Sequence, residues 1–135
     1  MLSALSPVES LADALVSERR LIDELLAVIY RQRAAVADDD LQVIEDSMFA
    51  THRLLVTLSE AKRRRRTLNT LLGQPEDVGI LALDRALGAR MTSELREARD
   101  GLHQAARTLS REVAVNRELL RGAMGASTGD AVKSA

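Results

Sequence analysis

The sequence predicts an all-α fold: a long antiparallel helical hairpin plus a third long helix, packed into an elongated, coiled-coil-like bundle. First, apolar residues recur every seven positions, in two staggered rows, along three long segments, as helices that pack side by side require. Second, glycine and proline are scarce between Pro7 and Pro75, whereas a β-sandwich needs turn residues at short intervals. Third, one Tyr and one Phe are the only aromatic residues among 135, which leaves the core of a single domain to aliphatic side chains.

The first helix is predicted over residues 7–37. Ser6 at the N-cap, Pro7 at the first helical position and Glu9 in the first turn form a capping box with a preset backbone angle. The two apolar rows are Leu15, Ile22, Ile29 and Val36, and Leu11, Glu18, Leu25 and Gln32. The two polar members of the second row are expected at the edge of the seam, where they specify register.

Three aspartates at residues 38–40 interrupt this period. Short carboxylate side chains favour a turn and the N-terminal cap of a following helix. The triplet lacks the glycine and the terminal glutamate of an EF-hand calcium loop, so it predicts a cap and not a metal site.

The second helix is predicted over residues 41–72, and we expect it to be the central element of the bundle. Its rows are Leu41, Met48 and Leu55, and Ile44, Thr51, Leu58, Arg65 and Leu72. Gly73 suits the position just after the helix, and Pro75 prevents continuation.

A basic run, Lys-Arg-Arg-Arg-Arg at residues 62–66, lies near the end of this helix. One interpretation is a solvated face that complements the negative end of the helix dipole or contacts a partner. The other is nucleic-acid binding through phosphates. Against the second, arginines at consecutive helical positions point all around the helix, no aromatic residues are interleaved, and the net charge is −1.

Charge is unevenly distributed along the chain. Residues 1–50 carry ten acidic and four basic side chains, whereas residues 51–75 carry six basic and one acidic. If the first two helices are antiparallel, opposite charges can meet along the hairpin. Because exposed pairs contribute only about 0–1 kcal/mol, these contacts would set register more than add stability.

The third helix is predicted over residues 76–123, with a weak point near residue 88. Glycines at 79 and 88 weaken the pattern within residues 74–89, so this stretch is either a short separate helix or the frayed start of the third. The rows of the third helix are Leu95, Leu102, Leu109 and Asn116, and Met91, Ala98, Ala105, Glu112 and Leu119. Because this seam is smaller and more polar, the helix either packs closely or is only partly engaged. Residues 124–135 are expected to be a disordered tail, which leaves residues 1–123 as the domain.

The residue types that carry catalysis and metal binding are few. The chain has no cysteine, and His52 and His103 are isolated from one another. No nucleophile, phosphate-binding or dinucleotide motif occurs, so we expect no enzyme activity, metal or cofactor. The N-terminus lacks the features of a signal peptide, and no apolar run approaches the roughly 20 residues that span a bilayer. A cytoplasmic protein without membrane insertion is therefore expected.

Because neither catalysis nor metal binding is expected, the remaining class of function is the binding of a partner through a helical surface. An apolar stripe at helical spacing runs along the end of the third helix and is the candidate partner-binding segment. Its members are Leu109, Val113, Asn116, Leu119, Leu120 and Met124. The alternative is that Leu109 and Val113 are ordinary core residues and that Met124 lies in a frayed end.

Several stretches resemble the FlgN-type flagellar export chaperones. They are Leu-Ile-Asp-Glu-Leu-Leu at 21–26, Gln32 with Ala-Ala-Val at 34–36, the aspartate run ending in Leu41, the leucines and arginines at 54–55, 58 and 64–65, Leu-Leu-Gly at 71–73, and Val-Asn-Arg-Glu-Leu-Leu at 115–120. The resemblance covers residues 21–124. The chain departs from the family by its arginines at 63–66 and by the glycine-rich tail.

The resemblance implies a cytoplasmic chaperone of the flagellar type III export system. Such a protein binds hook-associated (hook–filament junction) proteins before secretion and delivers them to the export gate, with export-gate or export-ATPase components as further partners. In that family the C-terminal helical segment contacts the substrate, which here corresponds to Val113, Asn116, Leu119 and Leu120.

Two other functions are compatible with the pattern. A non-catalytic coiled-coil structural or adaptor protein would self-associate through unfilled seams. A nucleic-acid-binding protein would show salt-dependent retention on DNA that is lost when the arginines at 63–66 are neutralised.

Overall fold

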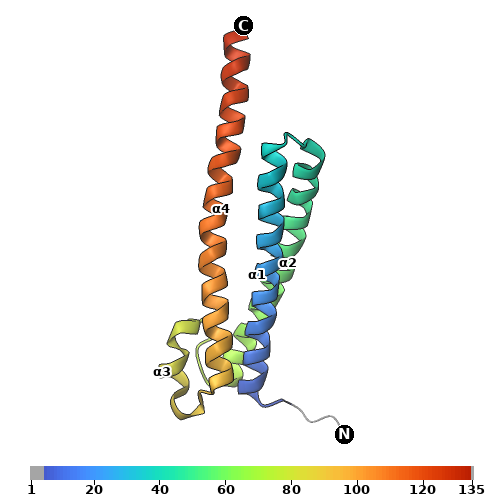
Figure 1. Cartoon of the computed structure of the whole chain (residues 1–135). Helices are drawn as coiled ribbons and strands as arrows, with labels where there is room; N and C mark the ends of the chain where they lie inside the picture. The colour runs from blue at the N-terminus through green and yellow to red at the C-terminus, as the bar shows by residue number, and fades with distance from the viewer. Residues whose placement is uncertain (1–4, 135) are drawn as a thin grey trace.

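A computed structural model describes the backbone of residues 5–134 and the side chains of residues 5–122, and this part of the chain consists of helices without strands. Three helices are long: α1 (Pro7–Ala37), α2 (Leu41–Leu71) and α4 (Ser93–Ser134). Figure 1 shows α1 and α2 as an antiparallel hairpin, with α4 alongside α1. The predicted all-α fold is confirmed.

The start of α1 and the turn to α2 have the predicted caps. The Ser6 hydroxyl accepts a hydrogen bond from the Glu9 backbone N–H at 3.2 Å. The Asp40 carboxylate accepts one from the Val43 N–H, also at 3.2 Å. Between the two helices Asp39 has a φ of 55°, a left-handed conformation that aspartate tolerates better than most residues. The aspartate triplet thus forms the hairpin turn and caps α2.

The end of α2 forms a Schellman motif around Gly73. Gly73 has a φ of 74°, and its N–H donates to the Thr70 carbonyl at 3.0 Å. The Gln74 N–H donates to the Asn69 carbonyl, also at 3.0 Å. This is the glycine-dependent helix end that the sequence predicted.

Short helical pieces fill the stretch before α4. They are η1 (Ile80–Ala82), α3 (Leu83–Leu87) and η2 (Gly88–Arg90). Gly88 has a φ of 54°, which breaks the helical path between α3 and η2. The third long helix therefore begins at Ser93 and not at residue 76, and of the two alternatives for residues 74–89 the short separate helix is correct.

Ion pairs attach α3 to α4. Asp84 contacts Arg96 at 3.1 Å and also pairs with Arg99. The hydrogen bond from Arg99 lowers the pKa of Asp84 from its ordinary value. These contacts hold α3 against the start of α4, at the end of the bundle that we call the foot. There Leu83 and Leu87 of α3 join the core.

At its other end α4 continues to Ser134, whereas the third helix was predicted to end at residue 123 and to be followed by a disordered tail. Alanines at 123, 126 and 131 are strong helix formers and no proline intervenes, so the backbone has no strong stop signal despite two glycines. Among the described residues, no helix combines the length and the apolar character that crossing a membrane requires.

The central element is α1 and not α2, contrary to the prediction. α1 packs extensively against both α2 and α4, whereas contacts between α2 and α4 are marginal at most. Its buried residues include Leu11, Leu15, Ile22 and Leu25, which join leucines of α2, α3 and α4 in one core. The sequence signal was present, since α1 has the most continuous apolar rows.

Opposite charges meet along the hairpin, as the charge distribution predicted. Arg64 lies 3.1 Å from Asp13, and Arg65 lies 2.9 Å from Glu18. The first pair is exposed, so its contribution is at most about 1 kcal/mol. Two members of the basic run thus bind α1.

Candidate functional site

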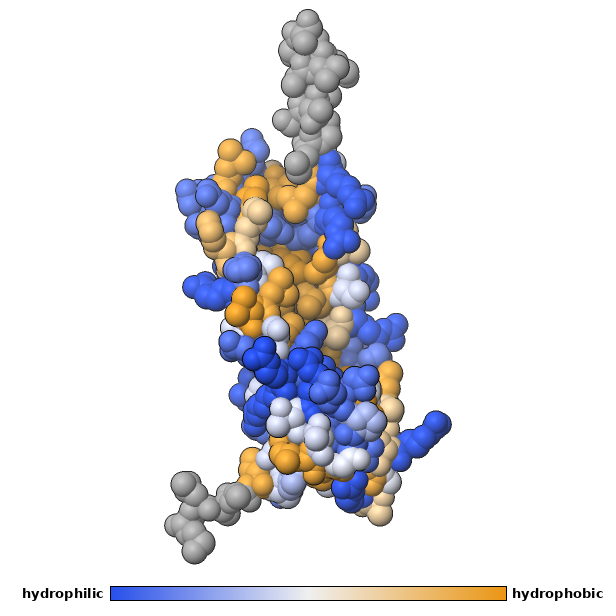
Figure 2. All heavy atoms as spheres, turned by 180° about the vertical axis from the view of Figure 1, so that it is seen from behind, coloured by the Kyte–Doolittle hydropathy of each residue, from blue (hydrophilic) through white to orange (hydrophobic). Residues whose placement is uncertain are grey.

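A groove stays open between α2 and α4 because both helices pack on α1 and hardly on each other. It consists of two clefts, of about 610 Å³ and about 480 Å³. Val113 and Arg117 line both clefts, so the two clefts are adjacent, and together we call them the α2/α4 groove. Figure 2 views the molecule from behind, where apolar side chains gather between hydrophilic margins in the upper half of the bundle.

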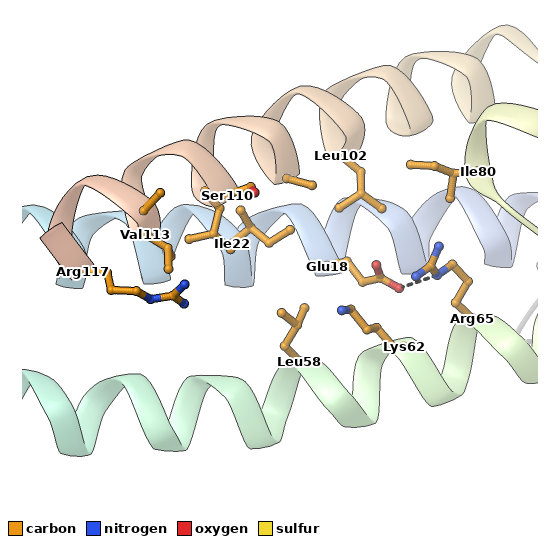
Figure 3. A pocket seen from close by; sticks show the side chains of 13 residues that line it. Glu18, Ile22, Leu58, Lys62, Arg65, Ile80, Leu102, Ser110, Val113 and Arg117 are labelled. Carbon is orange, nitrogen blue, oxygen red and sulfur yellow. Dashed lines mark ion pairs between the residues drawn. The ribbon is translucent and has the colours of Figure 1, made fainter. Parts of the chain in front are cut away.

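Each of the three long helices contributes one side of the α2/α4 groove. The floor is formed by Glu18, Ile22, Ile29 and Gln32 of α1. The α2 wall includes Met48, Thr51, Leu55, Leu58, Lys62 and Arg65. The α4 wall includes Leu102, Leu109, Val113, Arg117, Leu120 and Arg121. Figure 3 shows Ile22, Leu58 and Leu102 pointing into this space from three different helices.

The α2 wall holds apolar side chains that no helix covers. The row Ile44, Thr51, Leu58, Arg65 and Leu72 is buried or half-buried. The other row is exposed: Leu41 by 74%, Met48 by 61% and Leu55 by 50%. A row at seven-residue spacing is typical of a surface that packs against a partner helix, and no helix among the described residues covers this one. Contiguous exposed apolar surface of this kind is typical of interaction sites.

A buried acid lies at the end of the groove near the foot. Glu18 is 1% exposed, so it lies inside the seam and not at its edge as expected. Arg65 Nε is 2.9 Å from Glu18 Oε1, yet its N–H is not aligned with that oxygen, which has no hydrogen-bond donor among the described residues. Burial raises the pKa of Glu18, and the positive charges of Arg65 and Lys62 oppose that rise. The carboxylate is therefore only partly compensated.

At the opposite end, Asn116 attaches α4 to α1. Its side-chain N–H₂ donates to the Ile29 carbonyl at 2.8 Å and to Gln32 Oε1 at 3.3 Å, and its oxygen accepts from Arg33 Nε at 2.9 Å. Arg33 also pairs with Glu112, whose pKa the hydrogen bond from Arg33 lowers. Asn116 is 5% exposed and its amide is fully used within the bundle.

Most of the predicted partner-binding residues border this groove. Leu109, Val113, Asn116 and Leu120 line it, and the Asn116 amide is bonded to α1. Leu119 does not line it and forms a separate shallow patch with Val115. The side chain of Met124 lies outside the described residues.

Sequence reasoning missed the α2 wall and the basic margin of the groove. Lys62, Arg65, Arg117 and Arg121 line it, together with the exposed His52. The signal for the wall was the row of Leu41, Met48 and Leu55, which the structure leaves exposed. Among the described residues, no three His, Cys, Asp or Glu side chains gather as a metal site would require.

The chain was compared with known protein families. The family described as FlgN protein matches residues 1–128, which is nearly the whole chain. Comparison with curated proteins and with solved structures gives no match.

Proposed function

The chain belongs to the FlgN family, a family of flagellar export chaperones, and on this premise we propose that it binds hook-associated proteins in the cytoplasm before secretion and delivers them to the export gate. The observation that carries this proposal is the α2/α4 groove. A chaperone of this kind needs an apolar surface that stays open in the free protein, and the groove offers one along three helices.

The physical reason for such binding lies in both partners. A segment that folds only in the assembled filament exposes apolar side chains beforehand and is prone to wrong contacts. On entering the groove it covers Met48 and Leu55, which are half or more exposed in the free chain. Apolar burial at about 25 cal/mol per Å² then offsets the entropy lost when the segment becomes ordered.

Within the groove, the contacts we assign are Leu109, Val113 and Leu120 on α4 and Met48 and Leu55 on α2. Asn116 supports the wall, because its amide is committed to α1. Leu119 belongs to the separate patch with Val115 and is not assigned a contact in the groove.

The proposal is tested by mixing the full chain with the C-terminal region of a hook-associated protein at micromolar concentration and following co-elution in gel filtration. Leu55→Asp places a charge in the groove and should weaken the complex at least about tenfold. The matched control is Val56→Asp. Val56 is 49% exposed against 50% for Leu55 and does not line the groove.

Absence of any complex with the unmodified chain would refute the chaperone proposal. Equal weakening by Leu55→Asp and Val56→Asp would move the contact surface away from the groove. Far-ultraviolet circular dichroism of both variants must first show an unchanged helix content.

The second candidate is a coiled-coil adaptor that self-associates. The exposed row on α2 favours it, since a second copy could supply the missing helix. Sedimentation over a range of concentrations separates the two functions: an adaptor forms a concentration-dependent oligomer and shows no preference for hook-associated proteins.

A further inference from the structure

We infer that the segment held in the α2/α4 groove is an amphipathic helix of about 20 residues whose apolar stripe is flanked by acidic side chains. This inference rests on the proposed function and goes beyond it, because it fixes the conformation, length and charge of the bound segment. Three properties of the groove carry it, namely its lining, its length and its charge.

The lining requires a helix. An apolar groove offers few hydrogen-bond partners to a bound backbone, and an extended segment would leave its N–H and C=O groups unpaired there. A helix satisfies these groups internally. The walls and the floor are themselves helices, so a fourth helix in the groove would pack against all three with ordinary side-chain interdigitation.

The length of the groove sets the length of the segment. Along α4 the lining runs from Leu102 to Arg121, which at 1.5 Å per residue is about 28 Å. Along α2 it runs from Met48 to Arg65, about 26 Å. A helix of about 20 residues has this length.

The charge of the groove selects acidic flanks. Four basic residues line it, Lys62, Arg65, Arg117 and Arg121, together with a single acid, Glu18. Glu18 is already paired with Arg65. Among the described side chains neither Lys62 nor Arg117 forms an ion pair. Figure 3 shows Lys62 extending toward Glu18, whose carboxylate already pairs with Arg65, and Arg117 beside Val113.

The positions of these charges also predict where the acids lie. Lys62 is on the α2 wall near the foot, whereas Arg117 and Arg121 are on the α4 wall. Arg121 contacts Glu118 at 2.8 Å, an exposed pair worth at most about 1 kcal/mol, so it remains able to bind a second acid. Met48 and Arg121 line the same cleft. Lys62 lies 14 residues from Met48 on α2, so Lys62 and Arg121 are about 21 Å apart along the groove. Acids near both ends of the bound helix would therefore meet a base.

The test uses two labelled 20-residue peptides with one apolar stripe and identical composition otherwise, flanked by glutamates in one and by lysines in the other. Fluorescence anisotropy with the full chain should show the glutamate peptide binding at least about tenfold more tightly at low salt, with the difference shrinking as salt is added. Equal affinities would overturn the inference.

A neutralised groove variant, Lys62→Gln/Arg117→Gln/Arg121→Gln, should lose roughly tenfold in affinity for the glutamate peptide. The matched control, Arg63→Gln/Arg66→Gln/Arg107→Gln, removes the same charge from positions that do not line the groove. An equal loss in this control would show a non-specific effect of net charge and overturn the inference.

The failures of the two proposals are distinguishable. If hook-associated segments bind and neutralising the groove leaves that binding unchanged, the inference falls and the chaperone function stands. If the glutamate peptide binds and hook-associated segments do not, the function falls and the groove chemistry stands. Sedimentation of the free chain as a dimer that Leu55→Asp dissociates would identify a second copy as the occupant and overturn the inference.

Discussion

Truncating Asn116 to alanine should destabilise the bundle while leaving the apolar side chains of the groove in place. The bond from the Asn116 amide to the Ile29 carbonyl, at 2.8 Å, is between neutral groups and contributes about 1 kcal/mol. The bond from Arg33, at 2.9 Å, is charge-assisted and can contribute about 1.5–3 kcal/mol. The 3.3 Å contact to Gln32 adds little.

Two features of the site reduce this total. The Arg33 side chain is 32% exposed and keeps its pair with Glu112, so the lower end of its range applies. The Ile29 carbonyl still accepts the backbone N–H hydrogen bond of the next helical turn in α1, so it is not left without a donor. We therefore expect Asn116→Ala to lower the free energy of unfolding by about 2 kcal/mol, and Tm by about 6–10 °C for a chain of this size.

The assay is urea and thermal denaturation followed by circular dichroism, with Leu119→Ala as the control. Leu119 is on the same helix, is 41% exposed and has no part in the α1 contact that Asn116 makes, so its truncation should cost less than about 1 kcal/mol. A loss below 0.5 kcal/mol for Asn116→Ala, as an order-of-magnitude limit, together with lost client binding would refute the reasoning and make Asn116 a client contact.

Three further changes test individual features. Glu18→Gln should remove a pH-dependent contribution: because the folded pKa of Glu18 is raised, its contribution is full below the ordinary value of 4.5 and is lost as pH rises through the folded pKa. Gly73→Ala should cost about 1 kcal/mol in unfolding free energy, because alanine is strained at a φ of 74°. Gly101→Ala should stabilise α4 by up to about 1 kcal/mol, since the new Cβ meets only the flexible, exposed side chain of Arg19.

Each of these has a direct check in denaturation curves. For Glu18→Gln, unfolding free energies are compared with the unmodified chain from pH 7 down to the ordinary glutamate pKa, and parallel curves would contradict the pKa shift. Gly79→Ala is the control for Gly73, because Gly79 has a φ of −69° and open space at its Cβ. A destabilised Gly101→Ala variant would mean that Arg19 cannot move aside.

The long helices and their ends follow from local chemistry, which is why the sequence predicts them well. Ser6, Asp40 and Gly73 act through bonds to residues three to five positions away, so their roles depend on neighbours in the chain. The start of the third helix was placed too early, because the pattern there does not show that Gly88 adopts a φ of 54° and ends a short α3.

The candidate site was only partly predictable, because it depends on which helices leave a face uncovered. Of the predicted stripe on α4, Leu109, Val113, Asn116 and Leu120 line the groove, and their contact with a partner stays a prediction. Periodicity alone cannot tell which of two rows on α2 meets α1, and so Met48 and Leu55 looked like core. The bonds that attach Asn116 to α1 could not be predicted, because its three partners lie 83–87 positions away in the chain and meet it only in the folded bundle.

The separate attachment of α2 and α4 to α1 has a mechanical consequence. Because α2 and α4 pack on α1 and hardly on each other, we expect either wall to tilt relative to α1 with little loss of contact between the two walls. We expect the separation of the α2 and α4 walls to adjust to bound side chains of different size. Discrimination between bound segments would then come less from fit than from charge, and a single chain would hold one segment at a time.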